Sequence, residues 1–295
     1  MPKDPEIVFH IGAPHPDFDQ LTWSLRKDTD VLADHGVLLR RPSGYRATVD
    51  ATLDKLAGGP ATEQDQQALL NGILRNYPAK RLILSNSAFL GEPVSVPDGD
   101  RLFPRAGDAT KALRNLFPDH ACRFCLAIEN PAAIVAKAVQ SQTEAPPEDF
   151  FENLEARGLR WSDVIDRIRA QNPDCRITVW RIEDAPHSWP AILSAVTEIS
   201  TPAGFSGDLD IIEKMISKDE FSTLSGYLAG HSDMPNEHRG KVKKIFLKYF
   251  RKQDAAWDEI DLPGWTSDIV ETMTRDYDDD IKGIQEVPGV DLICA

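Results

Sequence analysis

Short apolar runs alternate with longer amphipathic segments over the first two thirds of the chain. The apolar runs are suited to burial on both faces, which is typical of strands in a parallel sheet. They comprise residues 7–11, 36–40, 81–85, 122–128 and 176–182. Because segments with helical spacing separate these runs, the pattern predicts an α/β fold with a doubly wound, mainly parallel sheet of about five strands.

Helix signals fit the same pattern. Asp19 is a candidate N-cap of a first helix with Gly36 as its C-terminal stop, and Pro131 suits the first position of a later helix. Residues 42–62 are rich in Pro, Gly, Ser and Thr and predict a variable loop around one short helix. Further amphipathic helices are expected at residues 63–77, 108–117, 132–140, 150–156, 161–171 and 189–199.

The character of the chain changes after Thr201 and Pro202. Beyond this point the sequence predicts only helices, followed by a short edge strand at residues 290–293. The helices are expected at residues 210–216, 221–228, 236–257 and 266–285. We therefore expect an α/β domain over residues 1–205 and a helical C-terminal part, residues 206–295, packed on the same domain.

Composition excludes several classes of function. Hydrophobic residues make up 41% and charged residues 27%, as in soluble globular proteins. No apolar run reaches the roughly eighteen residues that span a membrane, and no apolar stretch precedes the first strand, so we expect a cytoplasmic protein without a signal peptide. The formal net charge of −14 disfavours binding to nucleic acid or to an anionic membrane.

The cysteine, histidine and acidic residues lack the spacing that redox or metal-binding sites require. Cys122 and Cys125 form a C-x-x-C, but they lie within an expected strand and are predicted to be small buried residues. The seven histidines show no metal-binding spacing, so no metal is expected, and His10 is expected to be a hydrogen-bonded core residue. The acidic run 276–280 lacks the glycine and closing glutamate of an EF-hand, which predicts a solvated helix face.

Three polar segments should meet at one edge of the sheet. The carboxyl ends of parallel strands share one edge, and ligands bind there in folds of this kind. The segments are residues 12–19, 85–87 and 129–137. The first follows a strand, begins with Gly12 and leads into a helix, which is the frame of a phosphate-binding loop.

The segment Phe9-His-Ile-Gly-Ala-Pro-His15 resembles the H-I-G-x-x-K-x-G-T-T loop of bacterial sulfotransferase-like proteins. Further segments resemble other family motifs in the same order along nearly the whole chain. They are residues 32–38, 82–85, 126–133, 179–184 and 277–290. The resemblance implies a P-loop-type fold that transfers a sulfuryl group from 3′-phosphoadenosine-5′-phosphosulfate to a hydroxyl of a carbohydrate or small molecule.

The resemblance also implies roles for individual positions. His15 stands at the position of the family's lysine and is the candidate catalytic residue. The candidate acceptor site comprises Ser85, Asn86 and Ser87. The candidate donor site comprises Gly12, Ala13, His15, Asp19, Gln20, Asn130 and Lys137.

Several of these positions depart from the family pattern. Asp17 replaces the loop glycine, and Phe18 and Asp19 replace two threonines. At the site for the 3′-phosphate, Glu129 replaces an arginine and Lys137 a serine, and these two residues are close enough in such a fold to pair. Carboxylates repel an anionic donor. The alternatives are therefore a sulfotransferase, a non-catalytic family member that binds a glycan or a protein, and a transferase with a less anionic donor.

One basic segment, residues 241–252, stands out in the acidic chain. Its apolar residues recur at helical spacing and form a stripe of Val242, Ile245, Phe246 and Tyr249. This spacing predicts a helix that packs on the body through the stripe and keeps its lysines in solvent. The alternative function of the segment is a docking face for an acidic partner or for a sulfated or phosphorylated glycan.

Overall fold

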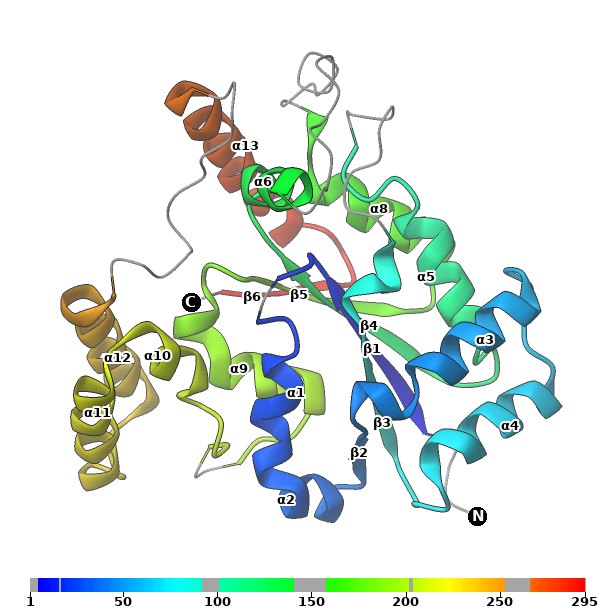
Figure 1. Cartoon of the computed structure of the whole chain (residues 1–295), viewed down its shortest axis with the longest axis horizontal. Helices are drawn as coiled ribbons and strands as arrows, with labels where there is room; N and C mark the ends of the chain where they lie inside the picture. Colours follow the sequence, from blue (N-terminus) through cyan, green and yellow to red (C-terminus); the bar gives the residue numbers. More distant parts are fainter. Residues whose placement is uncertain are drawn as a thin grey trace.

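A computed structural model describes residues 5–15, 17–91, 101–140, 158–201, 204–252 and 266–294. At its centre lies a six-stranded parallel sheet with the strand order β2-β3-β1-β4-β5-β6 (Figure 1). The strands are β1 (Glu6–Gly12), β2 (Val37–Leu39), β3 (Arg81–Ser85), β4 (Cys122–Ile128), β5 (Arg176–Arg181) and β6 (Val290–Ile293). The predicted α/β fold class is confirmed, and the expected edge strand is β6.

The two central strands are buried along almost their whole length. All residues of β4 are buried, as are all residues of β1 except Glu6. Phe9 of β1 stacks on Phe124 of β4 at a centroid distance of 5.6 Å and lies edge-on to Phe89 at 6.1 Å. This aromatic core fixes the start of the loop that follows β1.

Helices cover both faces of the sheet, as Figure 1 shows. On one side lie α1 (Gln20–Leu25), α2 (Thr29–Asp34) and α9 (Ala185–Thr197). On the other side lie α3 (Arg46–Leu56), α4 (Glu63–Leu74), α5 (Ala106–Asn115) and α8 (Trp161–Gln171). A further helix, α6 (Pro131–Gln140), follows β4 and begins at the proline that the sequence predicts as its first residue.

The first helix differs from its prediction. It is split into α1 and α2 by a 3₁₀ turn at Arg26–Asp28. Asp19 makes no side-chain capping bond to α1, and its carboxylate instead lies 3.3 Å from Arg46 Nη2. Asp19 is thus the N-cap residue of α1, as predicted, but its side chain does not cap the helix.

The region 42–62 contains more helix than its composition predicts. The helix α3 has 11 residues, of which only Val49 is buried, so its sequence shows little apolar periodicity. The buried residue Tyr45 anchors its start, because the hydroxyl donates to the Ser85 carbonyl oxygen at 2.8 Å and accepts from the Ser85 N–H at 2.6 Å. A tertiary contact thus determines this helix more than local sequence signals do.

The C-terminal region is helical, as predicted. It contains α10 (Asp210–Met215), α11 (Lys218–Gly230), α12 (Asn236–Phe250) and α13 (Ser267–Gln285). The buried carboxylate of Asp210 ties α10 to the segment around α1, since it accepts hydrogen bonds from Ser24 Oγ at 2.7 Å and Lys27 Nζ at 2.6 Å. The helix predicted at 150–156 and residues 253–257 of the one predicted at 236–257 lie outside the described residues. Within the described ranges, no helix has the length and apolar character needed to cross a membrane.

Two arginines tie the C-terminal end of α9 to the sheet. Arg123 of β4, which is 4% exposed, donates hydrogen bonds to the carbonyl oxygens of Ala195 at 3.0 Å and Val196 at 3.1 Å. Its guanidinium group also pairs with Glu198 at 3.1 Å, and Arg81 of β3 pairs with the same carboxylate. The last carbonyl groups of a helix lack partners within the helix and carry partial negative charge, so the guanidinium groups stabilise this end.

We expect Arg123→Leu to lower the free energy of unfolding by about 2–3 kcal/mol, because two helix-end carbonyl groups and a carboxylate lose their donor. Arg176→Leu is the matched control. Arg176 is the register partner of Arg123 on β5, but its ion pair with Asp291 is exposed, so its loss should cost less than about 0.5 kcal/mol. Urea denaturation measures both values, and equal losses would contradict the proposed role of Arg123.

One carboxylate of the acidic run 276–280 is buried, in contrast to the predicted solvated face. Asp280 of α13 is 8% exposed and accepts hydrogen bonds from the N–H groups of Trp161 at 2.8 Å and Ser162 at 3.1 Å. The Ser162 hydroxyl donates to the same carboxylate. Asp280 therefore caps the N-terminus of α8 and joins it to α13.

Removal of this cap in Asp280→Ala should lower the free energy of unfolding by about 1–2 kcal/mol. The neighbouring change Asp279→Ala alters an exposed carboxylate that pairs with Lys282, and should stay within about 0.5 kcal/mol of the parent protein. Both changes make the same replacement on the same helix, so thermal unfolding followed by circular dichroism isolates the contribution of the cap. Indistinguishable melting curves would show that the cap adds no stability.

Candidate functional site

Gly12 ends β1 where a side chain has no room. Its φ of +143° is rarely adopted by other residues, and a Cβ atom here would lie 2.2 Å from the carbonyl oxygen of Ala127 on β4. The next N–H group, that of Ala13, donates to the same oxygen at 2.9 Å. The close approach of two strands therefore requires this glycine, whether or not a ligand binds.

Three backbone N–H groups of the following loop bond within the loop itself. Asp17 N–H donates to His15 Nδ1 at 3.0 Å, and Phe18 N–H donates to the His15 carbonyl oxygen at 2.9 Å. Gln20 N–H donates to the Asp17 carbonyl oxygen at 2.8 Å. A phosphate-binding loop directs such groups at the anion instead. The loop therefore has the position of a phosphate-binding loop, but these N–H groups are already hydrogen-bonded within it.

A stack of three rings lies beneath the loop. The ring of His10 stacks on Phe18 at a centroid distance of 4.2 Å and on Trp180 at 5.5 Å. His10 Nδ1 and Ser85 Oγ share a hydrogen bond of 2.8 Å, and burial lowers the pKa of His10 to about 3. His10 is therefore an uncharged, hydrogen-bonded core residue, as predicted, and Phe18 is held in place by stacking on it.

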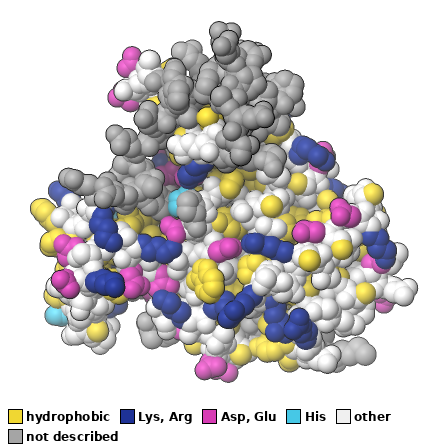
Figure 2. Space-filling model, viewed as in Figure 1, with side chains coloured by type: hydrophobic (Ala, Val, Ile, Leu, Met, Phe, Trp, Pro, Cys, Tyr) yellow, Lys and Arg dark blue, Asp and Glu magenta, His cyan; other side chains and the backbone are white. Residues whose placement is uncertain are grey.

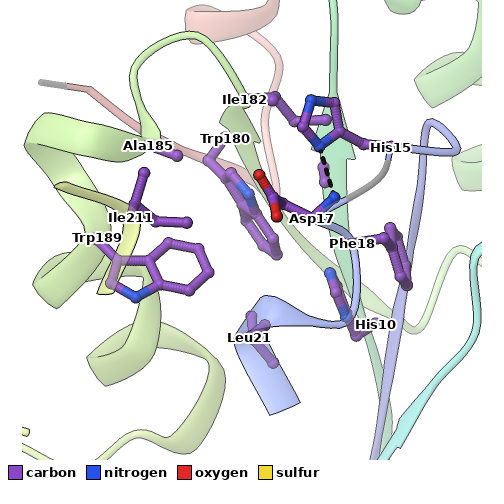
Figure 3. A pocket seen from close by; sticks show the side chains of 11 residues that line it. His10, His15, Asp17, Phe18, Leu21, Trp180, Ile182, Ala185, Trp189 and Ile211 are labelled. Atoms are coloured by element: carbon purple, nitrogen blue, oxygen red, sulfur yellow. Dashed lines mark hydrogen bonds between the residues drawn. The ribbon is translucent and has the colours of Figure 1, made fainter. Parts of the chain in front are cut away.

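His15, at the position of the family's lysine, is uncharged at neutral pH. Burial, reinforced by the charge of Lys137, lowers its pKa to about 4. Because Nδ1 accepts the Asp17 N–H (Figure 3), the proton of the neutral ring lies on Nε2, which is 3.9 Å from Glu129 Oε1. The imidazole therefore does not supply the positive charge of the family's lysine.

The two residues with reversed charges form an ion pair, as expected from the sequence. Lys137 Nζ of α6 bonds to Glu129 Oε1, which follows β4, and Glu129 is 5% exposed. Burial raises the pKa of Glu129 to about 7, although Lys137 opposes this shift. On the other side of the loop, Lys214 of α10 pairs with Asp17. Both of these lysines thus have a carboxylate partner.

The other predicted donor-site side chains also have partners within the chain. Gln20 Nε2 donates to Asp210 at 3.2 Å, on the side of α1 that faces α10. Asn130 Oδ1 accepts the Ala132 N–H at 2.9 Å at the start of α6, and its amide donates to Thr274 at 2.9 Å. The structure therefore brings His15 and Lys137 together around Glu129 but turns Gln20 away from them.

The predicted acceptor residues follow β3 at the same edge of the sheet. The Ser85 hydroxyl shares a hydrogen bond with His10, and Asn86 Oδ1 accepts a hydrogen bond from the Ala88 N–H at 3.1 Å. Ser87 starts the 3₁₀ turn Ser87–Leu90. Two of the three side chains thus have structural roles in positioning the end of β3.

A small pocket of about 30 Å³ lies between the loop, β5, α9 and α10 (Figure 3). Its polar rim is formed by His15 and Asp17, and its walls are mainly apolar. The largest apolar side chains in the walls are Phe18, Leu21, Trp180, Ile182, Trp189 and Ile211. Such walls suit an apolar or uncharged group better than a phosphosulfate.

The sequence pattern does not indicate most of these wall residues. Trp180 near the carboxyl end of β5 could have been found from the rule that ligands bind at this edge. Trp189, Ile211 and Lys214 lie far along the chain from the loop, and their positions depend on how α9 and α10 pack. No local motif marks these three residues.

The described residues contain no group of three His, Cys, Asp or Glu side chains that could hold a metal ion. Cys122 and Cys125 are free and buried, as predicted, and burial raises the pKa of both thiols. Comparison of the sequence with known protein families and with curated proteins finds no match. The resemblance to sulfotransferases therefore rests on the order of short motifs and on the fold.

The raised pKa of Glu129 predicts a specific dependence of stability on pH. The folded protein binds more protons than the unfolded chain between the ordinary pKa of 4.5 and about 7, so this group reduces stability as the pH rises through that range. Glu129→Gln removes the effect. The variant should therefore gain stability over the parent as the pH rises. The difference between their free energies of unfolding should grow by about 2 kcal/mol from a pH of about 5 to a pH of about 8.

Urea denaturation at several pH values tests this expectation. Lys137→Met provides a second readout, because Lys137 holds the pKa of Glu129 down and its removal should move the loss of stability to higher pH. Parallel pH profiles for the parent and Glu129→Gln would show that the carboxyl group ionises normally.

Proposed function

We propose that this chain is a non-catalytic, sulfotransferase-like protein that acts by binding a partner rather than by sulfuryl transfer. The observation that supports this proposal most strongly is the internal neutralisation of the donor site. Lys137 is paired with Glu129, Lys214 is paired with Asp17, and His15 is uncharged. Recognition of a phosphosulfate depends on cations and N–H groups directed at the anion, and here both lysines and three N–H groups of the loop already have partners.

The free energies of ion pairing and of binding favour this proposal over binding of the sulfuryl donor. For Lys137 to bind a phosphate, it must leave Glu129, and removing one partner from a buried ion pair costs about 3–5 kcal/mol. Micromolar affinity corresponds to only about 8 kcal/mol, so this cost removes a large part of it. Repulsion from Asp17 and Asp19 adds to the loss.

Transfer of a sulfuryl group to a carbohydrate or small-molecule hydroxyl is the alternative implied by the family resemblance. The reaction needs positive charge or strong donors at the transferring group. An imidazole with a pKa of about 4 does not carry that charge at neutral pH. The alternative therefore requires the site to rearrange before the donor can bind.

We expect adenosine 3′,5′-bisphosphate at millimolar concentration to change the melting temperature by less than about 1 °C. A ligand present at about 100 times its Kd would stabilise the folded state by about 2.7 kcal/mol, which corresponds to a shift of about 5 °C or more in a chain of this size. Differential scanning fluorimetry, with calorimetry as a second method, measures the difference.

A shift of that larger size would overturn the proposal and support a working donor site. In that case His15→Ala and Lys137→Ala should each reduce the shift, whereas Lys282→Ala should leave it unchanged. Lys282 is a matched control because it lies on α13 and pairs with Asp279 at the surface.

A further inference from the structure

The helix α12 packs through only part of the apolar stripe that its sequence predicts. Ile245 is 55% exposed and Tyr249, one turn later, is 70% exposed. Lys243 and Leu247, also one turn apart, are buried instead. α12 contacts α9 and α11 at the edge of the molecule where these helices lie (Figure 1). The prediction therefore holds for Val242 and Phe246, which pack against the core, and is wrong for Ile245 and Tyr249, which face solvent.

The buried face of α12 includes a charged residue. Burial lowers the pKa of Lys243, and the nearby Asp208 opposes this shift. Val242 and Phe246 are half-buried and contact the core from the same side. Packing of α12 on the body thus uses a lysine stem and three apolar residues and leaves Ile245 and Tyr249 outside the contact.

Lysines surround the two exposed apolar residues. We define the α12 ridge as Lys241, Lys244, Ile245, Lys248 and Tyr249, all of which are exposed. The Lys248 ammonium lies 5.8 Å from the centre of the Tyr249 ring, and Lys241 pairs with Glu237 at 2.6 Å. Figure 2 shows basic and hydrophobic side chains next to one another at this edge of the molecule. The ridge is locally positive on a chain with a net charge of −14.

From this arrangement we propose that the α12 ridge binds an acidic amphipathic helix of a partner protein, an inference that rests on the proposed binding function. Ile245 and Tyr249 have the one-turn spacing at which the apolar residues of a second helix recur. Tyrosine is enriched at the centres of protein interfaces, and charged residues belong to their rims. The lysines of the ridge would pair with carboxylates of the partner helix and orient it.

Other occupants fit the ridge less well. A second copy of the chain docking through its own α12 would place lysines against lysines. An anionic glycan could pair with the lysines, but Ile245 offers it no hydrogen bond. An anionic membrane would attract the ridge but repel the rest of an acidic protein.

A synthetic peptide tests the proposal with the full chain. The probe is a fluorescent helix of about five turns in which leucines recur at positions i, i+3, i+4 and i+7 among glutamates. A scrambled peptide of the same composition controls for charge alone. We expect the patterned peptide to bind with a Kd of the order of 10 μM in fluorescence anisotropy, and at least about tenfold more tightly than the scrambled peptide.

Variants then locate the binding site. Ile245→Asp combined with Tyr249→Asp should weaken binding at least about tenfold, and both residues are exposed, so the fold should be retained. Tyr227→Asp on α11 is the matched control, because Tyr227 is 44% exposed but lies outside the ridge. Lys244→Glu with Lys248→Glu should also weaken binding and reduce its dependence on salt.

Three outcomes would overturn the proposal: equal binding of patterned and scrambled peptides, unchanged binding by the Ile245 and Tyr249 variant, or stronger ridge-dependent binding of heparin or phosphatidylserine vesicles. The donor-site experiment is independent of these results. A thermal shift with the nucleotide alongside intact peptide binding would overturn only the non-catalytic proposal. Equal binding of the two peptides, without a thermal shift caused by the nucleotide, would overturn only the proposed binding role of the ridge.

Discussion

The close approach of β1 and β4 at Gly12 is the constraint on which both the sheet and the candidate site depend. These strands form the centre of the sheet, and a side chain at Gly12 would collide with the Ala127 backbone. The loop after β1 must therefore leave the sheet beside the residues that follow β4. This geometry places His15 next to Glu129 and Lys137, whatever the chemistry of the three side chains.

Once the loop is held there, its charges determine what it can bind. A carboxylate as deeply buried as Glu129 needs a cation, and Lys137 in the last turn of α6 supplies one. The same lysine and burial together keep His15 neutral. Because the charge of Lys137 lowers the pKa of both Glu129 and His15, removing this lysine would raise both pKa values. The site is a coupled structural unit rather than a set of independent ligands.

The sequence predicts the buried parts of this protein well and the surface parts less well. The central strands are continuous apolar runs because they are buried on both faces, and α8, whose range matches the predicted 161–171, has apolar periodicity because one of its faces is buried. The pairing of Glu129 with Lys137 is also predictable, since Glu129 directly follows a strand and Lys137 lies on the helix that comes next. The helix α3 and the pair of Asp17 with Lys214 depend on contacts between distant segments, which local patterns do not encode.

The orientation of α12 follows from a competition that periodicity alone cannot resolve. Apolar residues occur around most of this helix, so packing on α9 and α11 can bury only some of them. The body selects the face with Phe246 and Leu247, and Lys243 lies on that face despite the cost of desolvating its ammonium group. Stability alone would favour a polar residue in place of Ile245 or Tyr249 on the solvent side. The large apolar side chains that stay exposed beside lysines therefore support the proposal that a partner helix docks on this surface.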